Sequence, residues 1–298
     1  MKTREEKRFQ FFANLIMTLF SIFCMVPIIL LLISSFTDND TILRNGYSFF
    51  PQKLSLGAYG YLISKGGQIF RAYGISALVT FIGTTIGISI TALLAYPLSR
   101  RDLPGRNVFS FIVFFTMLFN GGLVPTYLMY TGIFHIKNTL WALIIPSLLM
   151  NAYYVMLMRS FFSTSIPFEI IEAAHIDGAS EFKTFAMIVL PMARPIIATV
   201  GLFIGIAYWN DWNNGFIYLT TRTDLFSIQN LLNRMIQDIQ FLSSNSSVAG
   251  NITSSLSKIP STTVRMAIAV TGILPVAIIY PFLQNNFVKG ITLGAVKG

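Results

Sequence analysis

The sequence has few of the residues that enzymes use for covalent chemistry or for metal binding. One cysteine, Cys24, and two histidines, His135 and His175, occur among its 298 residues. A lone cysteine cannot form an internal disulfide, and the isolated histidines predict no metal site. The chain also lacks the Gly-x-x-x-x-Gly-Lys-Ser/Thr phosphate-binding loop and any arrangement that would activate a serine nucleophile. We therefore expect a protein that is not an enzyme and does not hydrolyse ATP itself.

Charged residues make up only 11% of the chain, whereas a soluble domain carries about 25%. Five runs without a charged side chain reach the roughly 20 residues that a membrane-spanning helix needs, and a sixth is interrupted only by Asp211. Runs of this length without alternation exclude barrel strands. The sequence predicts an all-α integral membrane protein in which one membrane domain, residues 11–288, contains six transmembrane helices. The predicted spans are residues 11–36, 72–99, 107–128, 139–159, 195–220 and 265–286.

Lysine and arginine residues predict the orientation in the membrane. If the N-terminus is cytoplasmic, twelve of the 21 basic residues fall in inside segments, and the densest groups lie in residues 1–10 and 100–106. Because cytoplasmic loops are enriched in lysine and arginine, we expect residues 1–10 and the tail 287–298 to be cytoplasmic. The basic residues stand at the ends of spans, so the net charge of +9 indicates contact with anionic lipid headgroups and not with nucleic acid.

A polar stretch, EIIEAAHIDGASEFKTFAMIVLP, separates two apolar runs on the predicted cytoplasmic side. Pro167 suits the first turn of a helix, Gly178 can end it in a left-handed conformation, and Ser180 can cap a second helix. The stretch therefore predicts two short helices at a bend. They could lie on lipid headgroups, but interfacial helices usually present lysine and arginine, so an acidic surface fits a basic protein partner better. The acidic residues are Glu169, Glu172, Asp177 and Glu181.

The spacing within this stretch resembles a known signature. Glu172-Ala173-Ala174, then Gly178, then Ile188-Val189-Leu190-Pro191 are similar to the EAA motif of permease subunits in binding-protein-dependent ABC importers. The resemblance implies the type I ABC importer permease fold, with a cytoplasmic coupling helix pair in the loop 165–191. In that family the loop sits in a cleft of an ATPase subunit, where Glu172 would pair with a cation and Gly178 would set the bend. The residues implied in ATPase coupling are Glu169, Glu172, Ala173, Ala174, Asp177, Gly178, Leu190 and Pro191.

Other segments are similar to one branch of this family. Trp209-Asn210 and residues 287–292 resemble the sugar importers, in particular their maltose-permease-like second subunit, and residues 120–125 resemble the importers of complex oligosaccharides in Gram-positive bacteria. The resemblance implies the membrane-spanning subunit of an ATP-driven carbohydrate importer in the bacterial cell membrane. Its implied partners are a second permease subunit in a heterodimer, two ATPase subunits, which bind the ATP and Mg, and an extracellular solute-binding lipoprotein. This chain itself is expected to bind no cofactor.

Polar residues within the predicted spans are candidates for a substrate path, because an ionisable group at depth in a membrane usually has a function. Asp211 is the only acid in a predicted span, and carboxylates, amides and aromatic faces commonly hold sugars. The alternative is that Asp211 and its tryptophan neighbours belong to an aromatic belt at the outer interface. The candidate path residues are Asn120, Asn151, Trp209, Asn210 and Asp211.

The predicted outside segment 222–263 begins with an amphipathic pattern and continues into serine, asparagine and glycine. This composition predicts a helix followed by a flexible loop. In maltose-permease-like subunits the loop reaches into the pocket of the docked binding protein, and residues 243–262 suit either such a contact or an idle linker. Asn245 and Asn251 are the candidate contact residues.

Two other functions compete with the importer. A secondary transporter or channel for a small polar solute would need buried ionisable residues or broken symmetric helices, and only Asp211 could serve such a mechanism. A membrane scaffold or sensor would use the acidic helix pair as a signalling contact. ATP-dependent uptake in the presence of the partner subunits would separate the importer from both alternatives.

Overall fold

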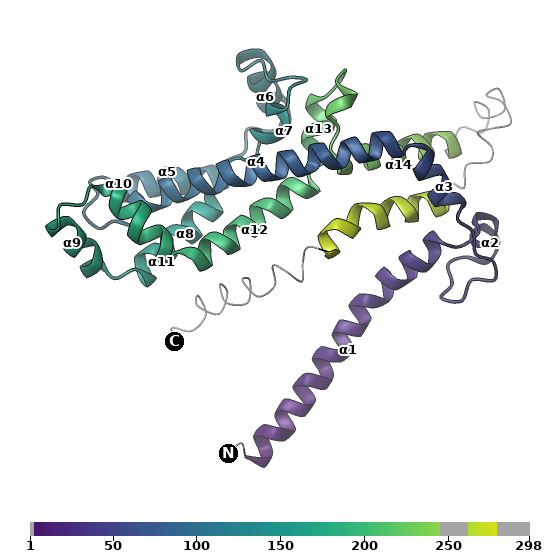
Figure 1. The fold of residues 1–298 in the computed structure, drawn as a ribbon, viewed down its shortest axis with the longest axis horizontal. Coiled ribbons are helices and arrows are strands. Elements are labelled where there is room, and N and C mark those ends of the chain that lie inside the picture. Colours follow the sequence, from purple (N-terminus) through teal and green to yellow (C-terminus); the bar gives the residue numbers. More distant parts are fainter. Residues whose placement is uncertain (1–2, 245–261, 279–298) are drawn as a thin grey trace. The chain divides into compact units, whose positions relative to one another are not determined.

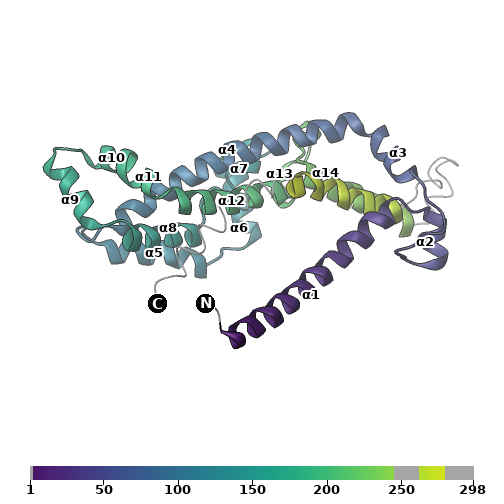
Figure 2. The same cartoon turned by 60° about the horizontal axis from the view of Figure 1, so that its bottom comes forward.

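The computed structural model describes residues 3–244 and 262–278, and every regular element in these residues is a helix (Figures 1 and 2). One isolated antiparallel bridge joins Thr37 to Leu54. The chain divides into two compact units. Unit 1 comprises Met1–Ile69 and Leu232–Pro275, and unit 2 comprises Phe70–Leu231 and Val276–Gly298.

Unit 1 begins with α1, a long apolar helix. No part of its most apolar window is buried within the protein, as expected of a helix that faces lipid. Thr3 and Glu6 form a capping box at its start, each side chain accepting the backbone N–H of the other residue. The Asn39 side chain accepts the backbone N–H of Thr262 at 3.1 Å and fixes the start of the last described helix. The helices of unit 1 are α1 (Arg4–Ser35), α2 (Asn39–Asn45), α3 (Gly57–Ser64), the greater part of α14 (Ile228–Ser244) and Thr262–Ile278.

Unit 2 has its apolar core between α4, α8 and α12. Ala95, Val155, Met158 and Val200 are fully buried there. Short helices lie at both ends of these longer ones (Figure 1). The helices of unit 2 are most of α4 (Gly66–Ser99), α5 (Arg106–Leu118), α6 (Leu123–Leu128), η1 (Met129–Ile133), α7 (Trp141–Ile144), α8 (Ala152–Ser165), α9 (Phe168–Ile176), α10 (Glu181–Thr184), η2 (Phe185–Val189), α11 (Leu190–Met192), α12 (Arg194–Asn210), α13 (Asn213–Tyr218) and η3 (Thr223–Leu225).

Glycines let α4 and α12 approach each other closely. A β-carbon on Gly83 would overlap the ring of Tyr208, and one on Gly201 would lie 2.7 Å from the Cδ1 atom of Ile88. Tyr208 is only 2% exposed, and its hydroxyl donates to the Ile144 carbonyl at 2.8 Å. Small residues at a helix crossing are a common means of packing helices in membranes. The α4–α12 contact is therefore specified by glycines and by one anchored tyrosine.

Two helices, α1 and α4, are long and apolar enough to cross a membrane on their own. Two further pairs are long enough together but bent: α5 with Leu123–Ile133 by 112°, and Glu181–Met192 with α12 by 82°. By length and composition, the described residues thus hold two spans, or up to four if each bent pair is one span. Of the predicted last span, 265–286, the structure describes residues up to 278. The count of six spans therefore stays a prediction.

Two predicted spans are divided in the structure. Residues 107–128 separate into α5 and α6 at Asn120-Gly121-Gly122, where the paired glycines favour a break. Residues 139–159 separate into the short α7 and the longer α8. Pro146 cannot continue α7 because it has no N–H to donate, and Asn151 caps α8 by accepting a backbone N–H of its first turn at 2.9 Å.

Candidate functional site

Helix α9, the first half of the predicted coupling pair, lies at one end of unit 2 (Figures 1 and 2). It has one buried and one exposed face. Ile171 and Ala174 are each 7% exposed and pack toward the rest of the unit. Ile176, by contrast, is 86% exposed. Ala174 is thus unavailable to a partner, whereas Ala173 is exposed. The outer face of α9 consists of Glu169, Glu172, Ala173 and Ile176, and the exposed Asp177 follows directly.

The predicted bend after α9 is confirmed. Gly178 has a φ of +77°, a conformation that L-residues other than asparagine and aspartate seldom adopt. The N–H of Ala179 donates to the Ala174 carbonyl at 2.9 Å and closes the end of the helix. The Ser180 side chain then accepts the Lys183 N–H at 3.4 Å and starts α10. The two helices therefore meet at a turn that local backbone chemistry determines.

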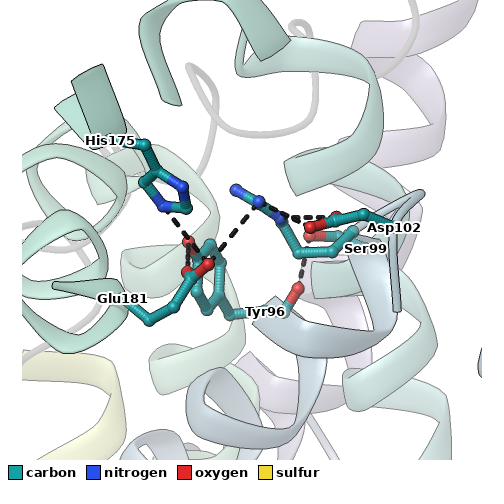
Figure 3. A network of polar contacts seen from close by, with 6 residues as sticks. Tyr96, Ser99, Asp102, His175 and Glu181 are labelled. Atoms are coloured by element: carbon teal, nitrogen blue, oxygen red, sulfur yellow. Dashed lines mark hydrogen bonds and ion pairs between the residues drawn. The ribbon is translucent and has the colours of Figure 1, made fainter. Parts of the chain in front are cut away.

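A cluster of polar side chains, here the Arg100 network, lies where α9 and α10 meet the C-terminal end of α4 (Figure 3). Arg100 is 9% exposed and donates to both carboxylate oxygens of Asp102, at 3.0 and 2.9 Å. Its Nη2 atom also lies 3.6 Å from Glu181 Oε1. Glu181 accepts the Tyr96 hydroxyl at 2.9 Å and approaches His175 Nε2 at 3.2 Å. One carboxylate on α10 is therefore in contact with α4, with the turn after α4 and with α9.

Glu181 thus makes contacts within its own chain that the interpretation of the four carboxylates as one acidic docking surface did not include. Its side chain is nevertheless 58% exposed, and a role of Glu181 in docking stays a prediction. Sequence reasoning missed this contact because Tyr96 and Glu181 are 85 positions apart. It also treated Arg100 only as a marker of orientation, although the Arg-x-Asp spacing of Arg100 and Asp102 was a signal for a local ion pair. All four carboxylates of the loop, Glu169, Glu172, Asp177 and Glu181, are exposed.

The hydrogen bonds between Arg100 and Asp102 shift the pKa of both groups. The bond to Asp102 raises the pKa of Arg100, although burial of the guanidinium acts in the opposite direction. The same bond lowers the pKa of Asp102 below its ordinary value. A carboxyl group with a lowered pKa in the folded state contributes stability above its ordinary pKa and loses that contribution as the pH falls through the lowered value. Arg100 and Asp102 are therefore both charged at neutral pH.

Two arginines and a serine satisfy the last two backbone carbonyls of α4. Arg106 Nε and Arg159 Nε both donate to the Leu98 carbonyl, at 3.0 and 2.9 Å, and the Ser163 hydroxyl donates to the Ser99 carbonyl at 3.3 Å. Carbonyls at a helix C-terminus have no partner within the helix, and positive charge is favourable there. These contacts connect the end of α4 to α5 and α8.

The candidate path residues do not form one group. Asn120 accepts the Gly122 N–H at 2.9 Å in the break between α5 and α6, and Asn151 caps α8. Trp209 and Asn210 end α12; the Trp209 ring stacks on Tyr73 with ring centroids 6.3 Å apart. Asp211 comes next and accepts the backbone N–H groups of Asn213 and Asn214 at 3.1 and 3.2 Å. The candidate contact residues Asn245 and Asn251 lie outside the described residues.

A substitution of Asp211 separates a capping role from a substrate role. Asp211→Ala should lower the free energy of unfolding by about 1 kcal/mol, since the start of α13 loses its side-chain acceptor. Asp211→Asn keeps an oxygen acceptor and should retain both stability and substrate uptake. Thermal unfolding in detergent and uptake by proteoliposomes measure the two effects. A stable Asp211→Asn protein without uptake would show that the charge itself serves transport.

A second substitution tests the bend. A β-carbon on Gly178 would meet no atom within 4 Å, so Gly178→Ala acts through backbone strain alone, about 1–2 kcal/mol. Amide hydrogen exchange in α9 should accelerate by about 5- to 30-fold if that strain opens the turn. Gly178→Asn is the matched control, because asparagine adopts positive φ more readily, and it should exchange more slowly than Gly178→Ala. Equal exchange in both variants would contradict the account of the bend.

The closely packed apolar helices and the acidic helix pair beside them define the class of the protein as a membrane transport subunit. Residues 83–293 match the family described as "Binding-protein-dependent transport system inner membrane component", and the chain belongs to this family. It is thus a permease subunit of an ABC importer, a transport subunit and not an enzyme. The importer hypothesis is confirmed over a secondary transporter or channel. ABC importer permeases work in a complex with another permease, an ATPase and a binding protein.

Individual relatives are similar over nearly their whole length. The chain is 36% identical to the polygalacturonan/rhamnogalacturonan transport system permease protein YtcP of Bacillus subtilis, covering 94% of this chain and 95% of the relative. It is 33% identical to protein LplC of the same organism, covering 92% and 90%. Among solved structures, a bacterial ABC transporter involved in the import of the acidic polysaccharide alginate superposes with a TM-score of 0.77 at 27% identity, covering 96% and 99%. These matches confirm the type I importer permease fold.

Proposed function

We propose that this chain is the permease subunit of an oligosaccharide importer and that the outer face of α9 docks on the ATPase. The observation that carries the docking proposal is the 86% exposure of Ile176 on the same face as Glu169 and Glu172. A large apolar side chain among carboxylates suits a protein surface with an apolar pocket and a basic rim. A lipid surface would instead favour lysine and arginine.

The residues of the proposed docking surface have different tasks. Glu172 forms an ion pair with a cation of the ATPase, and Ala173 is small enough to let the partner backbone come close. Ala174 supports α9 from its buried side. Leu190 is half-buried and Pro191 is exposed, and both precede the 82° bend into α12. These two residues therefore shape the path from the docking surface into the membrane and do not bind the partner.

The names of the relatives support an oligosaccharide substrate. Besides the relatives above, the chain is 25% identical to the arabinooligosaccharides transport system permease protein AraQ of Halalkalibacterium halodurans. We propose that the substrate is an oligosaccharide and that acidic ones, built from uronic acids, are the first to test. YtcP and the alginate transporter are both named for acidic polysaccharides, which makes this class the better supported one.

Transport by the reconstituted complex tests the proposed function. The chain is to be purified with its second permease, ATPase and binding protein, and ATP-dependent uptake measured for oligogalacturonates, oligoalginates and neutral arabinooligosaccharides. We expect uptake of at least one acidic oligosaccharide together with stimulation of ATP hydrolysis by the loaded binding protein. Uptake of the neutral arabinooligosaccharides alone would show that the substrate is a neutral and not an acidic oligosaccharide. The absence of uptake for all three in an ATP-hydrolysing complex would contradict an oligosaccharide substrate.

We propose as well that the chain crosses the membrane six times with both termini cytoplasmic. The excess of lysine and arginine in residues 1–10 and 100–106 supports this orientation. The position of Arg100, Arg106 and Arg159 around one end of α4 is consistent with a cytoplasmic end of that helix. The orientation can be measured by introducing a cysteine at either terminus and labelling it from one side of inverted vesicles.

A further inference from the structure

We propose that Arg100 and Glu181 are positioning residues that fix the α9–α10 loop to the end of α4, so that a movement of the docking surface is transmitted to α4. The proposal rests on the docking function proposed above. It assigns these side chains a role that needs no contact of their own with the ATPase. The loop and the end of α4 would then move as one body during the transport cycle.

The first support is that the Arg100 network contacts both ends of α9. Near its C-terminal end, His175 lies 3.2 Å from Glu181. At its first residue, the Phe168 ring lies 5.7 Å from the guanidinium carbon of Arg100, a cation–π contact. A helix held at both ends cannot tilt without breaking one of these contacts. The orientation of the outer face of α9 is therefore linked to the position of Arg100.

The second support is that the end of α4, which Arg100 follows, is held in place by hydrogen bonds from other helices. It follows α4 directly, and the last carbonyls of α4 accept hydrogen bonds from Arg106 on α5 and from Arg159 and Ser163 on α8. Arg100 is 9% exposed and held by two hydrogen bonds to Asp102. A force on Glu181 is thus passed to a helix end that is itself connected to two other helices.

The third support is that direct packing between α10 and α4 is incomplete. An open cavity of about 470 Å³ lies beside the network, lined by Leu93 and Pro97 of α4 and by Phe182 of α10. Helices as short as α9 and α10 are not stable in isolation, so their position depends on tertiary contacts. Besides the contact of the Tyr96 ring with the buried Phe185 ring, whose centroids are 5.2 Å apart, the polar contacts of Glu181 are therefore a main connection between this part of the loop and α4.

Glu181→Ala is the variant that separates positioning from docking. It removes the contacts to Tyr96, Arg100 and His175, but Arg100 keeps its bonds to Asp102, so no buried charge is left without a partner. The outer face of α9 is unchanged. We expect the ATPase to co-purify and to be stimulated by the loaded binding protein, while the amount of substrate transported per ATP hydrolysed falls at least about fivefold, the lower range of coupling between sites.

Three variants control this experiment in the complete importer. Glu181→Asp keeps the charge and should recover a substantial part of the substrate transported per ATP hydrolysed. Tyr96→Phe removes one hydrogen bond and should lower this ratio less than Glu181→Ala does. Lys183→Ala alters an exposed side chain on the same short helix and should leave the ratio unchanged. The monodisperse fraction in detergent shows whether each variant folds.

The outcomes distinguish the two proposals. An unchanged ratio of transport to hydrolysis in Glu181→Ala would overturn the positioning role and leave docking intact. Loss of the ATPase from Glu181→Ala would also overturn it, because the residue would then belong to the docking surface or to the fold. If the wild-type chain itself retained no ATPase, the proposed docking function would fail independently of Glu181.

Discussion

Glu172→Ala is expected to release the ATPase from the purified complex. Removing one partner of a buried, hydrogen-bonded charge pair at an interface costs about 2–5 kcal/mol, which corresponds to a loss of affinity of about 30-fold to a few thousand-fold. Ile176→Asp should have a comparable effect, because it places a charge where an apolar pocket is expected. Co-purification of the ATPase with the tagged chain, followed by titration of free ATPase, measures both.

Two exposed residues elsewhere are the matched controls. Glu5→Ala removes an exposed carboxylate from the first turn of α1, and Ile63→Asp changes an apolar side chain in α3 that is 77% exposed. Neither should alter the binding of the ATPase. An effect of Glu172→Ala no larger than that of Glu5→Ala would contradict the docking proposal.

Gly83→Ala is expected to destabilise the folded chain more than any other single methyl group added to α4. The new β-carbon overlaps the Tyr208 ring, and this ring cannot withdraw freely because it is buried and its hydroxyl is bonded to the Ile144 carbonyl. Overpacking of this kind typically costs about 1–3 kcal/mol. Thermal unfolding in detergent, followed by intrinsic tryptophan fluorescence, measures the loss.

Gly74→Ala is the matched control for that prediction. Gly74 lies on the same helix, and a β-carbon there would meet no atom within 4 Å. Alanine is favoured over glycine in a helix by up to about 1 kcal/mol, so this variant should be as stable as the wild type or slightly more stable. Equal stability of Gly83→Ala and Gly74→Ala would show that the α4–α12 contact is looser than described.

Local sequence patterns predicted the elements whose causes are local. The uncharged runs predicted α1 and α4, since length and composition alone decide whether a helix can cross a membrane. The turn after α9 followed from Gly178 and Ser180, which act within a few residues. The break between α5 and α6 lies at Gly121-Gly122 and also has a local cause. In each of these cases, neighbours along the chain contain the whole physical reason.

The features that escaped prediction depend on distant contacts. The direction of Glu181 is set by Tyr96 and Arg100, which join it only when α4 and α10 pack together. For Glu181, the sequence shows the carboxylate, whereas its partners are known only after the backbone is folded. Asp211 is a different case, because its oxygen accepts the N–H groups of Asn213 and Asn214, a local contact at the start of α13 that was not predicted.

The single cysteine of the chain allows the most direct measurement of ATPase docking on α9. In a Cys24→Ser background, Ala173→Cys and Ile176→Cys place one thiol on the outer face of α9, and Ile63→Cys is the exposed control. Each variant is treated with a short thiol-reactive photocrosslinker in membranes that contain the ATPase subunits. We predict a crosslinked product of permease and ATPase from the two α9 positions and none from position 63. An intact complex without any product from either α9 position would contradict docking through this face.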